Sequence, residues 1–267
     1  MWRLFKIEWM KIKSYVAFKF LFGGFLVLFI LAFWTTAQQF MKQFSGKSIE
    51  EVVLKNLVGS PFVFPKVWQS AAWMGGLFFI IIGMLFIILI ANEFQYKTHR
   101  QNIIDGWDRM DFIKAKLSVL LFFLLTSTAL VFVSGLLIGL IYTPSGELGN
   151  IFEGSIYILY FMLMALVYLL VAFFTAIIIK RTGLSIVVYF GLVFVIDNLL
   201  WASLTLKGSQ IGYFLPLESV DSLIPNPFTP KMLMKREVPD WSLIAAAVVY
   251  SILFLYTLRK HFKKIDL

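Results

Sequence analysis

The sequence predicts an all-α, polytopic membrane protein, and three observations lead to this fold class. Of the 267 residues, 60% are hydrophobic and only 15% are charged, whereas ordinary soluble domains carry about a quarter charged residues. The apolar residues are collected in long blocks, as in chains that cross a bilayer. The blocks lack the alternation of membrane-spanning strands. They are therefore predicted to be helices of one domain, residues 1–267.

Six of these blocks are long enough to cross a bilayer, which takes about 20 residues at a rise of about 1.5 Å each. They cover residues 18–37, 71–90, 117–142, 155–179, 184–206 and 241–258. All eight prolines fall in the connecting segments, so the spans are expected to be continuous rods. Glycines that leave room for a break are Gly75, Gly76, Gly83 and Gly191.

The basic residues predict the orientation of the chain. Sixteen of the 24 lie in the N-terminal lead, in the connections between spans two and three and between spans four and five, and in the C-terminal tail. Because cytoplasmic loops carry the excess of Lys and Arg, both termini are expected in the cytoplasm. The net charge of +9 then reflects topology and gives no reason to expect a nucleic-acid partner.

The N-terminal segment 1–17 is predicted to be an amphipathic elbow helix. Apolar residues recur at spacings of three and four and share one helical face: they are Trp2, Phe5, Trp9 and Ile12. Lys and Arg side chains occupy the other faces, a pattern typical of helices in the headgroup plane of the bilayer. The helix either anchors the chain to the membrane surface or also touches a cytoplasmic partner.

A charged segment, residues 93–112, separates the second and third spans. The second helix is expected to continue to Ile104 and to stop at Asp105-Gly106, since Gly is common just after a helix C-terminus. The result is a cytoplasmic helix–turn–helix knob whose exposed side chains include Tyr96, Thr98, His99, Arg100, Trp107 and Phe112. Aromatic and Arg side chains are typical interface anchors. The alternative is a solvated loop whose charges only enforce topology.

The same segment carries the pattern E-F-x-x-x-T-x-R, a Gly, and R-x-x-F-x-x-x-K, formed by Glu93, Phe94, Thr98, Arg100, Gly106, Arg109, Phe112 and Lys116. With the six spans, the elbow and the cytoplasmic termini, it resembles the permease subunits of type 2 ATP-binding-cassette (ABC) transporters, over essentially the whole chain. His99 departs from the pattern, where a small apolar residue is more common.

The resemblance implies that residues 93–112 form a coupling helix that docks on an ABC ATPase subunit. The implied interface is Glu93, Phe94, Thr98, His99, Arg100, Gly106, Arg109 and Phe112. The implied function is that of the permease subunit of an ABC exporter, in the inner (plasma) membrane of a bacterium. A second permease copy or a sister permease would complete the pathway, and the partner ATPase would bind ATP and Mg.

The chain itself shows no nucleotide-binding, metal or catalytic motif. Gly46-Lys47-Ser48 is its only G-K-S, and Met41 stands where the first Gly of a phosphate-binding loop belongs. There is no Cys, and the only histidines are His99 and His261, so a metal site within one chain is not expected. We therefore expect no enzymatic activity and no cofactor in this chain.

The outward side holds the remaining candidates. Residues 207–240 are long for a connection and form either a re-entrant segment or a proline-stiffened cap. Asp197 is the one formal charge within a span; with Asn198 it lines a substrate path or gate, or serves helix packing. Gly135 and Gly139 permit close helix approach, expected within the bundle rather than at a dimer seam.

An ion-coupled carrier or channel without an ATPase is the rival hypothesis. Such proteins need charges or broken helices within the membrane, and by sequence only Asp197 meets this need. A membrane enzyme is a third alternative, but the spans contain no H-E-x-x-H, no G-x-S-x-G and no convincing carboxylate pair.

Overall fold

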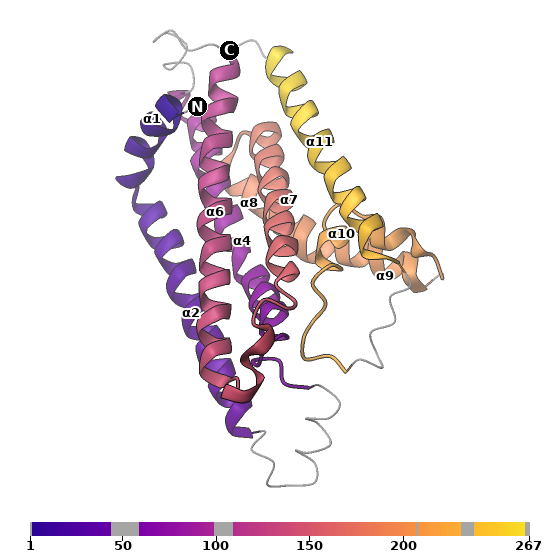
Figure 1. Cartoon of the computed structure of the whole chain (residues 1–267). Helices are drawn as coiled ribbons and strands as arrows, with labels where there is room; N and C mark the ends of the chain where they lie inside the picture. Colours follow the sequence, from indigo (N-terminus) through magenta and orange to yellow (C-terminus); the bar gives the residue numbers. More distant parts are fainter. Residues whose placement is uncertain (1, 44–58, 99–108, 207, 231–237, 265–267) are drawn as a thin grey trace.

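The computed structural model of the chain describes residues 2–43, 59–98, 109–206, 208–230 and 238–264, and these contain helices and no strand (Figure 1). The elements are α1 (Trp2–Lys13), α2 (Val16–Gln43), α4 (Val67–Gln95), α6 (Arg109–Tyr142), η1 (Ser145–Asn150), α7 (Ile156–Ile179), α8 (Thr182–Phe190), η2 (Gly191–Ile196), α9 (Asp197–Leu206), η3 (Gln210–Phe214), α10 (Glu218–Asp221) and α11 (Asp240–Lys264). Within the described ranges, six helices are long and apolar enough to cross a membrane. The predicted all-α, multi-pass membrane fold is confirmed.

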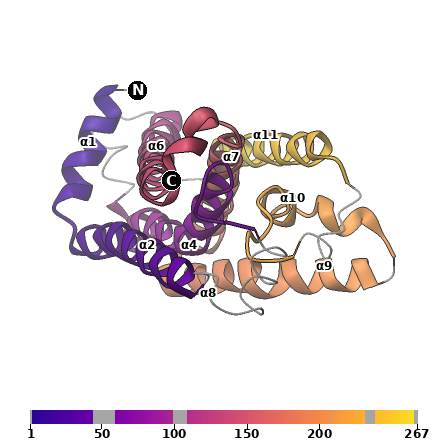
Figure 2. The ribbon, with the colours of Figure 1, turned by 60° about the horizontal axis from the view of Figure 1, so that its bottom comes forward.

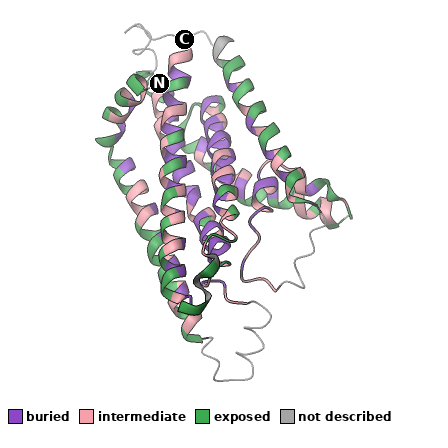
Figure 3. Ribbon diagram, in the orientation of Figure 1, coloured by how far each residue is buried: buried purple, intermediate pink, exposed green. Residues whose placement is uncertain are grey.

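Helices α4 and α7 form the centre of the bundle. In the most apolar 18-residue stretch of α4 and of α7, about 61% and 67% is buried, against 22–33% in the other spans. Figure 3 shows buried residues concentrated on these two helices. Both are apolar on all sides, as expected of helices surrounded by protein. Small residues of α4 allow its neighbours to come close: a Cβ on Gly75 would lie 2.7 Å from Val131 of α6 and 3.0 Å from the Phe161 ring of α7. The outer helices present exposed apolar faces, as a lipid environment requires.

The glycines of α6 pack inside this bundle, as predicted. A Cβ on Gly135 would lie 3.1 Å from the Cβ of Ala71, on α4. A Cβ on Gly139 would run into the ring of Phe64, in the turn that leads to α4. The G-x-x-x-G pattern therefore brings α6 onto α4 and is not available as a dimer seam.

The fifth span is continuous from Thr182 to Leu206, as expected, but it is not α-helical throughout. Its middle, Gly191–Ile196, is π-helical and joins α8 to α9. The wider turn leaves carbonyls poorly bonded within the helix, and the Asn198 amide donates to two of them, those of Val193 (2.9 Å) and Phe194 (3.3 Å). This rod is strongly inclined to α4, α6 and α7 and runs out of the bundle on the same side as α11 (Figures 1 and 2).

The segment after α9 turns back and packs against α7 and α11, an arrangement that the re-entrant alternative for residues 207–240 expects. The Tyr250 hydroxyl, near the middle of α11, donates to the carbonyl of Phe214 in η3 (2.8 Å). The Tyr168 hydroxyl, near the middle of α7, donates to the carboxylate of Asp221 in α10. Figure 2 shows α10 between α9 and α11. Residues 231–237 of this segment lie outside the described part.

Both ends of the chain lie at one end of the bundle, together with the end of α4 and the start of α6 (Figure 1). The α7–α8 junction joins them, since the Thr182 hydroxyl donates to Asn92 of α4 (2.6 Å). This is the arrangement that an even number of spans requires, and it gathers the basic segments on one face. We call this face the basic end.

Candidate functional site

Helix α1 folds against α6 at the basic end. Of the four predicted elbow residues, Ile12 is buried, and Phe5 and Trp9 place their rings 6.0 and 5.0 Å from that of Phe122. Trp2 is different, because 76% of its surface is exposed. The apolar face of the elbow is therefore used mainly for packing on the bundle, and only its first turn presents a large ring outward.

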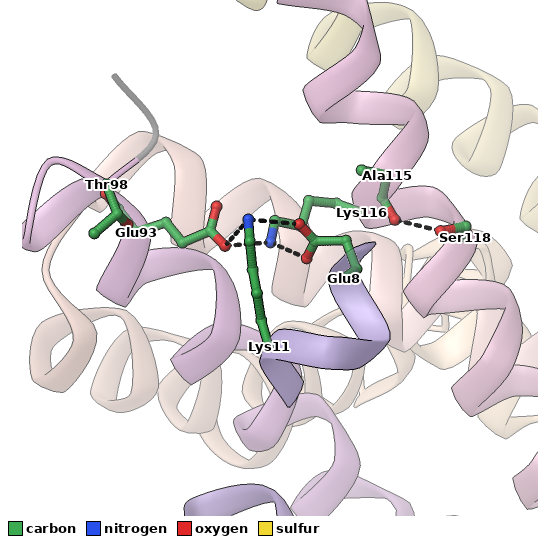
Figure 4. Close-up of polar contacts among 7 residues, drawn as sticks. All are labelled: Glu8, Lys11, Glu93, Thr98, Ala115, Lys116 and Ser118. Atoms are coloured by element: carbon green, nitrogen blue, oxygen red, sulfur yellow. Dashed lines mark hydrogen bonds and ion pairs between the residues drawn. The ribbon is translucent and has the colours of Figure 1, made fainter. Parts of the chain in front are cut away.

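Four charged side chains from three helices meet beneath α1 (Figure 4). The ammonium of Lys116, in α6, donates to Glu8 of α1 (2.5 Å) and to Glu93 of α4 (2.8 Å). Lys11 of α1 lies 3.1 Å from Glu8 and 3.6 Å from Glu93. The side chains of Lys116 and Glu8 are only 2% and 1% exposed. We call these four residues the elbow cluster.

Attraction to neighbouring lysines keeps Glu8, the carboxylate that α1 contributes to the elbow cluster, in its ionised form. Burial alone would raise the pKa of Glu8, but attraction to Lys116 and then Lys11, with their hydrogen bonds, lowers it below its ordinary value of 4.5. Glu8 is therefore ionised at neutral pH. A buried ion pair costs several kcal/mol of desolvation per ion in general, so removal of one partner by substitution would leave a buried charge uncompensated.

Glu8 was missed as a site residue by sequence reasoning. Within the basic N-terminal segment it appears only as an interruption. The signal that it points inward is its position four residues before Ile12, which places both on one helical face. Lys116 and Glu93 both belong to the sequence pattern, but nothing in their spacing predicts that they meet.

Several predicted interface residues turn inward instead of outward. Phe94 and Phe112 are buried, with 7% and 5% of their surface exposed, and their rings meet edge to face at 5.7 Å. The Lys116 ammonium lies 5.3 Å from the Phe112 ring. The expectation that Phe112 is an exposed anchor is therefore wrong, because it fills the angle between α4 and α6. Glu93 faces the elbow cluster.

The prediction that α4 continues without interruption beyond the second span is also wrong. The helix ends at Gln95, and Lys97 adopts a left-handed backbone conformation with φ of 57°, which a continuing helix does not allow. Tyr96 and Thr98, on either side of Lys97, are exposed. His99, Arg100 and Gly106 lie outside the described residues, as does the side chain of Arg109, whose backbone begins α6.

Asp197 and Asn198, the predicted pair in the fifth span, have different surroundings. Asp197 is buried, and it accepts hydrogen bonds from the backbone N–H groups of Leu217 and Glu218, so it fastens the start of α10 to α9. Asn198 lines a cavity that it shares with α4, α7 and α10. Of the two alternatives for this pair, Asp197 fits a packing role, and Asn198, which is exposed, stands at the cavity.

Acidic residues of α10, Glu218 and Asp221, lie near Asp197, and no pattern in the sequence predicts that they enter the bundle. Burial raises the pKa of Asp221 to about 8 and that of Glu218 to about 7. The charges of Glu218 and Asp197 raise the pKa of Asp221 further, while the hydrogen bond from Tyr168 opposes the rise. Within the described part of the chain, no group of three His, Cys, Asp or Glu side chains is placed to hold a metal ion.

Comparison with known proteins identifies a family without assigning it an activity. No curated protein and no solved structure matches the chain. The family described as "Protein of unknown function (DUF2705)" matches residues 59–267, a range that takes in α4 to α11, including Glu93, Lys116 and the α10 carboxylates, but not α1. Since this range covers most of the sequence, the chain belongs to the DUF2705 family.

Proposed function

We propose that this protein is the membrane-spanning permease subunit of an ABC transporter, an exporter in which a separate ATPase subunit binds ATP and Mg. The observation that carries the proposal is the elbow cluster. It ties α1, α4 and α6 together directly beside the connection between α4 and α6, where the resemblance places the coupling helix. Both termini and this connection would face the cytoplasm.

The elbow cluster supplies a means of transmitting force. Glu8, Glu93 and Lys116 are joined by hydrogen bonds, with the Glu8 and Lys116 side chains buried, and the Phe94–Phe112 contact closes the same angle. A displacement of the connection would therefore move three helices as one body instead of bending each separately. Packed helices commonly switch by such rigid-body steps.

The whole transporter needs more than one chain. Two permease copies, identical or sister, would enclose the pathway, and the exposed apolar faces of α2, α9 and α11 are available to the partner copy or to lipid. The exposed Tyr96 and Thr98 mark where the ATPase would approach.

An ion-coupled carrier is the second candidate, and two observations favour it. The fifth span contains a π-helical segment, and π-turns are frequent at functional sites. Glu218 and Asp221 bring further carboxylates to the middle of the bundle beside Asp197. Carriers of this class place such groups on their ion pathways.

Purification of the tagged chain from its native membranes separates the two candidates. We expect a polypeptide with a phosphate-binding loop to copurify, and the double variant Arg100→Glu with Arg109→Glu to recover less than a tenth of it. The matched reversal Lys42→Glu with Lys66→Glu, at the opposite end of the bundle, should recover it fully. Equal recovery in both double variants would contradict the docking assignment. Transport that persists without ATP and stops with a proton uncoupler would favour the carrier.

A further inference from the structure

A cavity of about 280 Å³ lies between α4, α7, η2 and α10. Apolar and aromatic side chains form most of its wall, including Trp73, Ile80, Met164, Phe194 and Ile224. Polar groups enter it from three elements, namely Tyr168, Asn198 and Asp221. An apolar space with a few convergent polar groups is the usual form of a small-molecule site.

The polar end of this cavity is built around Asp221. Both of its carboxylate oxygens accept hydrogen bonds from the Tyr168 hydroxyl, at 3.0 and 2.8 Å. The buried Tyr189 hydroxyl lies behind this group, against Gly83, and does not line the cavity. Among the described residues, the polar groups that a ligand in the cavity would meet are therefore Tyr168, Asn198 and Asp221.

The charge at this end is not balanced by the described part of the chain. No basic side chain there forms an ion pair with Asp197, Glu218 or Asp221. A ligand that carries its charge toward Asp221 would therefore have to be positive. A bare metal ion is a poor fit, because Asp221 is the only carboxylate of the wall and hard cations take six or more oxygen ligands.

We propose that this cavity binds an amphipathic organic cation, with its positively charged nitrogen beside Asp221 and its apolar body between α4 and α7. The aromatic side chains of Trp73, Phe194 and Tyr168 in the wall favour such a ligand, since aromatic rings attract organic cations. A neutral ligand would gain from the apolar wall alone. An anion would be repelled by all three carboxylates when they are ionised.

Binding of the cation does not depend on an ATPase partner, although a role for it as cargo rests on the transport function proposed above. Occupation of the site requires the ionised form of Asp221, whose pKa is raised to about 8 by burial. The cation should therefore displace a proton near neutral pH. The other titratable groups that face Asp221 are Asp197, Glu218, Tyr168 and Tyr189.

The test is direct binding to the purified chain in lipid nanodiscs, with tritiated phenethyltrimethylammonium as the probe and its neutral carbon isostere as competitor. We expect the cation to bind at least tenfold more tightly than the isostere, and Asp221→Asn to remove this preference. Asp221→Glu, which keeps the charge, should retain it. The matched control is Asp240→Asn, because Asp240 also accepts a hydrogen bond from an α7 tyrosine, Tyr160 (3.1 Å), but does not line the cavity.

A pH series on the wild-type chain keeps the test decisive if Asp221→Asn does not fold. Because the probe has no titratable proton, its affinity should rise at least tenfold from pH 6 to pH 9, while that of the isostere stays constant. Glu218→Gln, which removes the neighbouring carboxylate, should keep most of this rise. A wild-type chain that binds cation and isostere equally at pH 9, or an unchanged preference in Asp221→Asn, overturns the proposal. These outcomes are independent of whether an ATPase copurifies.

Discussion

Lys116 is the residue on which the basic end of the molecule depends. It lies in α6 where α1 and α4 both approach, and it is the buried one of the two lysines that pair with both Glu8 and Glu93. Its ammonium lies 5.3 Å from the Phe112 ring. One side chain thus joins the electrostatic and the aromatic contacts of three helices.

Replacing Lys116 with Met tests this role. The substitution keeps most of the side-chain volume but leaves two carboxylates without their buried partner, and breaking a buried pair costs about 3–5 kcal/mol in general. We expect a clear fall in the unfolding temperature, followed by intrinsic tryptophan fluorescence in detergent. Lys114→Met is the matched control: its pair with Asp111 is half exposed, and such pairs contribute about 0–1 kcal/mol. Equal effects of the two variants would contradict a structural role for the elbow cluster.

Helix α6 also packs closely on α4 and the turn before it, because two of its glycines leave room for side chains from that segment. The contact at Gly139 is made by the ring of Phe64, just before α4 begins, and that at Gly135 by Trp68 and Ala71. In contrast, Gly23 in α2 has open space where a side chain would stand. The same residue type therefore has a packing role in one helix and none in the other.

Gly139→Ala should destabilise the bundle while Gly23→Ala should not. An added methyl group at Gly139 forces the Phe64 ring to move, and overpacking costs about 1–3 kcal/mol. Alanine at Gly23 removes the penalty of about 1 kcal/mol that glycine carries within a helix. The two variants are compared by thermal unfolding. If Gly139→Ala unfolds at the same temperature as Gly23→Ala, the close contact at Gly139 is contradicted.

The whole molecule is asymmetric along the bundle. One end gathers the start of α1, the end of α4, the start of α6, the end of α11 and the elbow cluster, and the opposite end holds the ends of α2 and α6 and the start of α7 (Figure 1). The re-entrant η3 and α10 enter from that opposite side and stop near the middle of α7 and α11. Irregular backbone at this depth is tolerated because protein covers it.

The absence of cysteine in the sequence makes the orientation of the bundle simple to measure. Single cysteines introduced at Tyr96 and Lys260, which are exposed at the basic end, should react with a membrane-impermeant maleimide only after the cells are permeabilised. A cysteine at Lys42, exposed at the opposite end of α2, should react in intact cells. The reverse pattern would place the basic end outside and would rule out docking of a cytoplasmic ATPase on it.

The six helices and the common side of the chain ends were predictable from the sequence, because apolar length and the distribution of Lys and Arg are local properties of the chain. The packing glycines of α6 were predictable too. Which side chains meet follows from the folded arrangement alone: Glu8 reaches Lys116 across 108 positions of sequence, Phe112 turns inward, and Asp221 enters the bundle to meet Tyr168. The physical reason is that a buried charge or ring is stable only with a partner, and in this protein those partners come from helices that are distant in sequence.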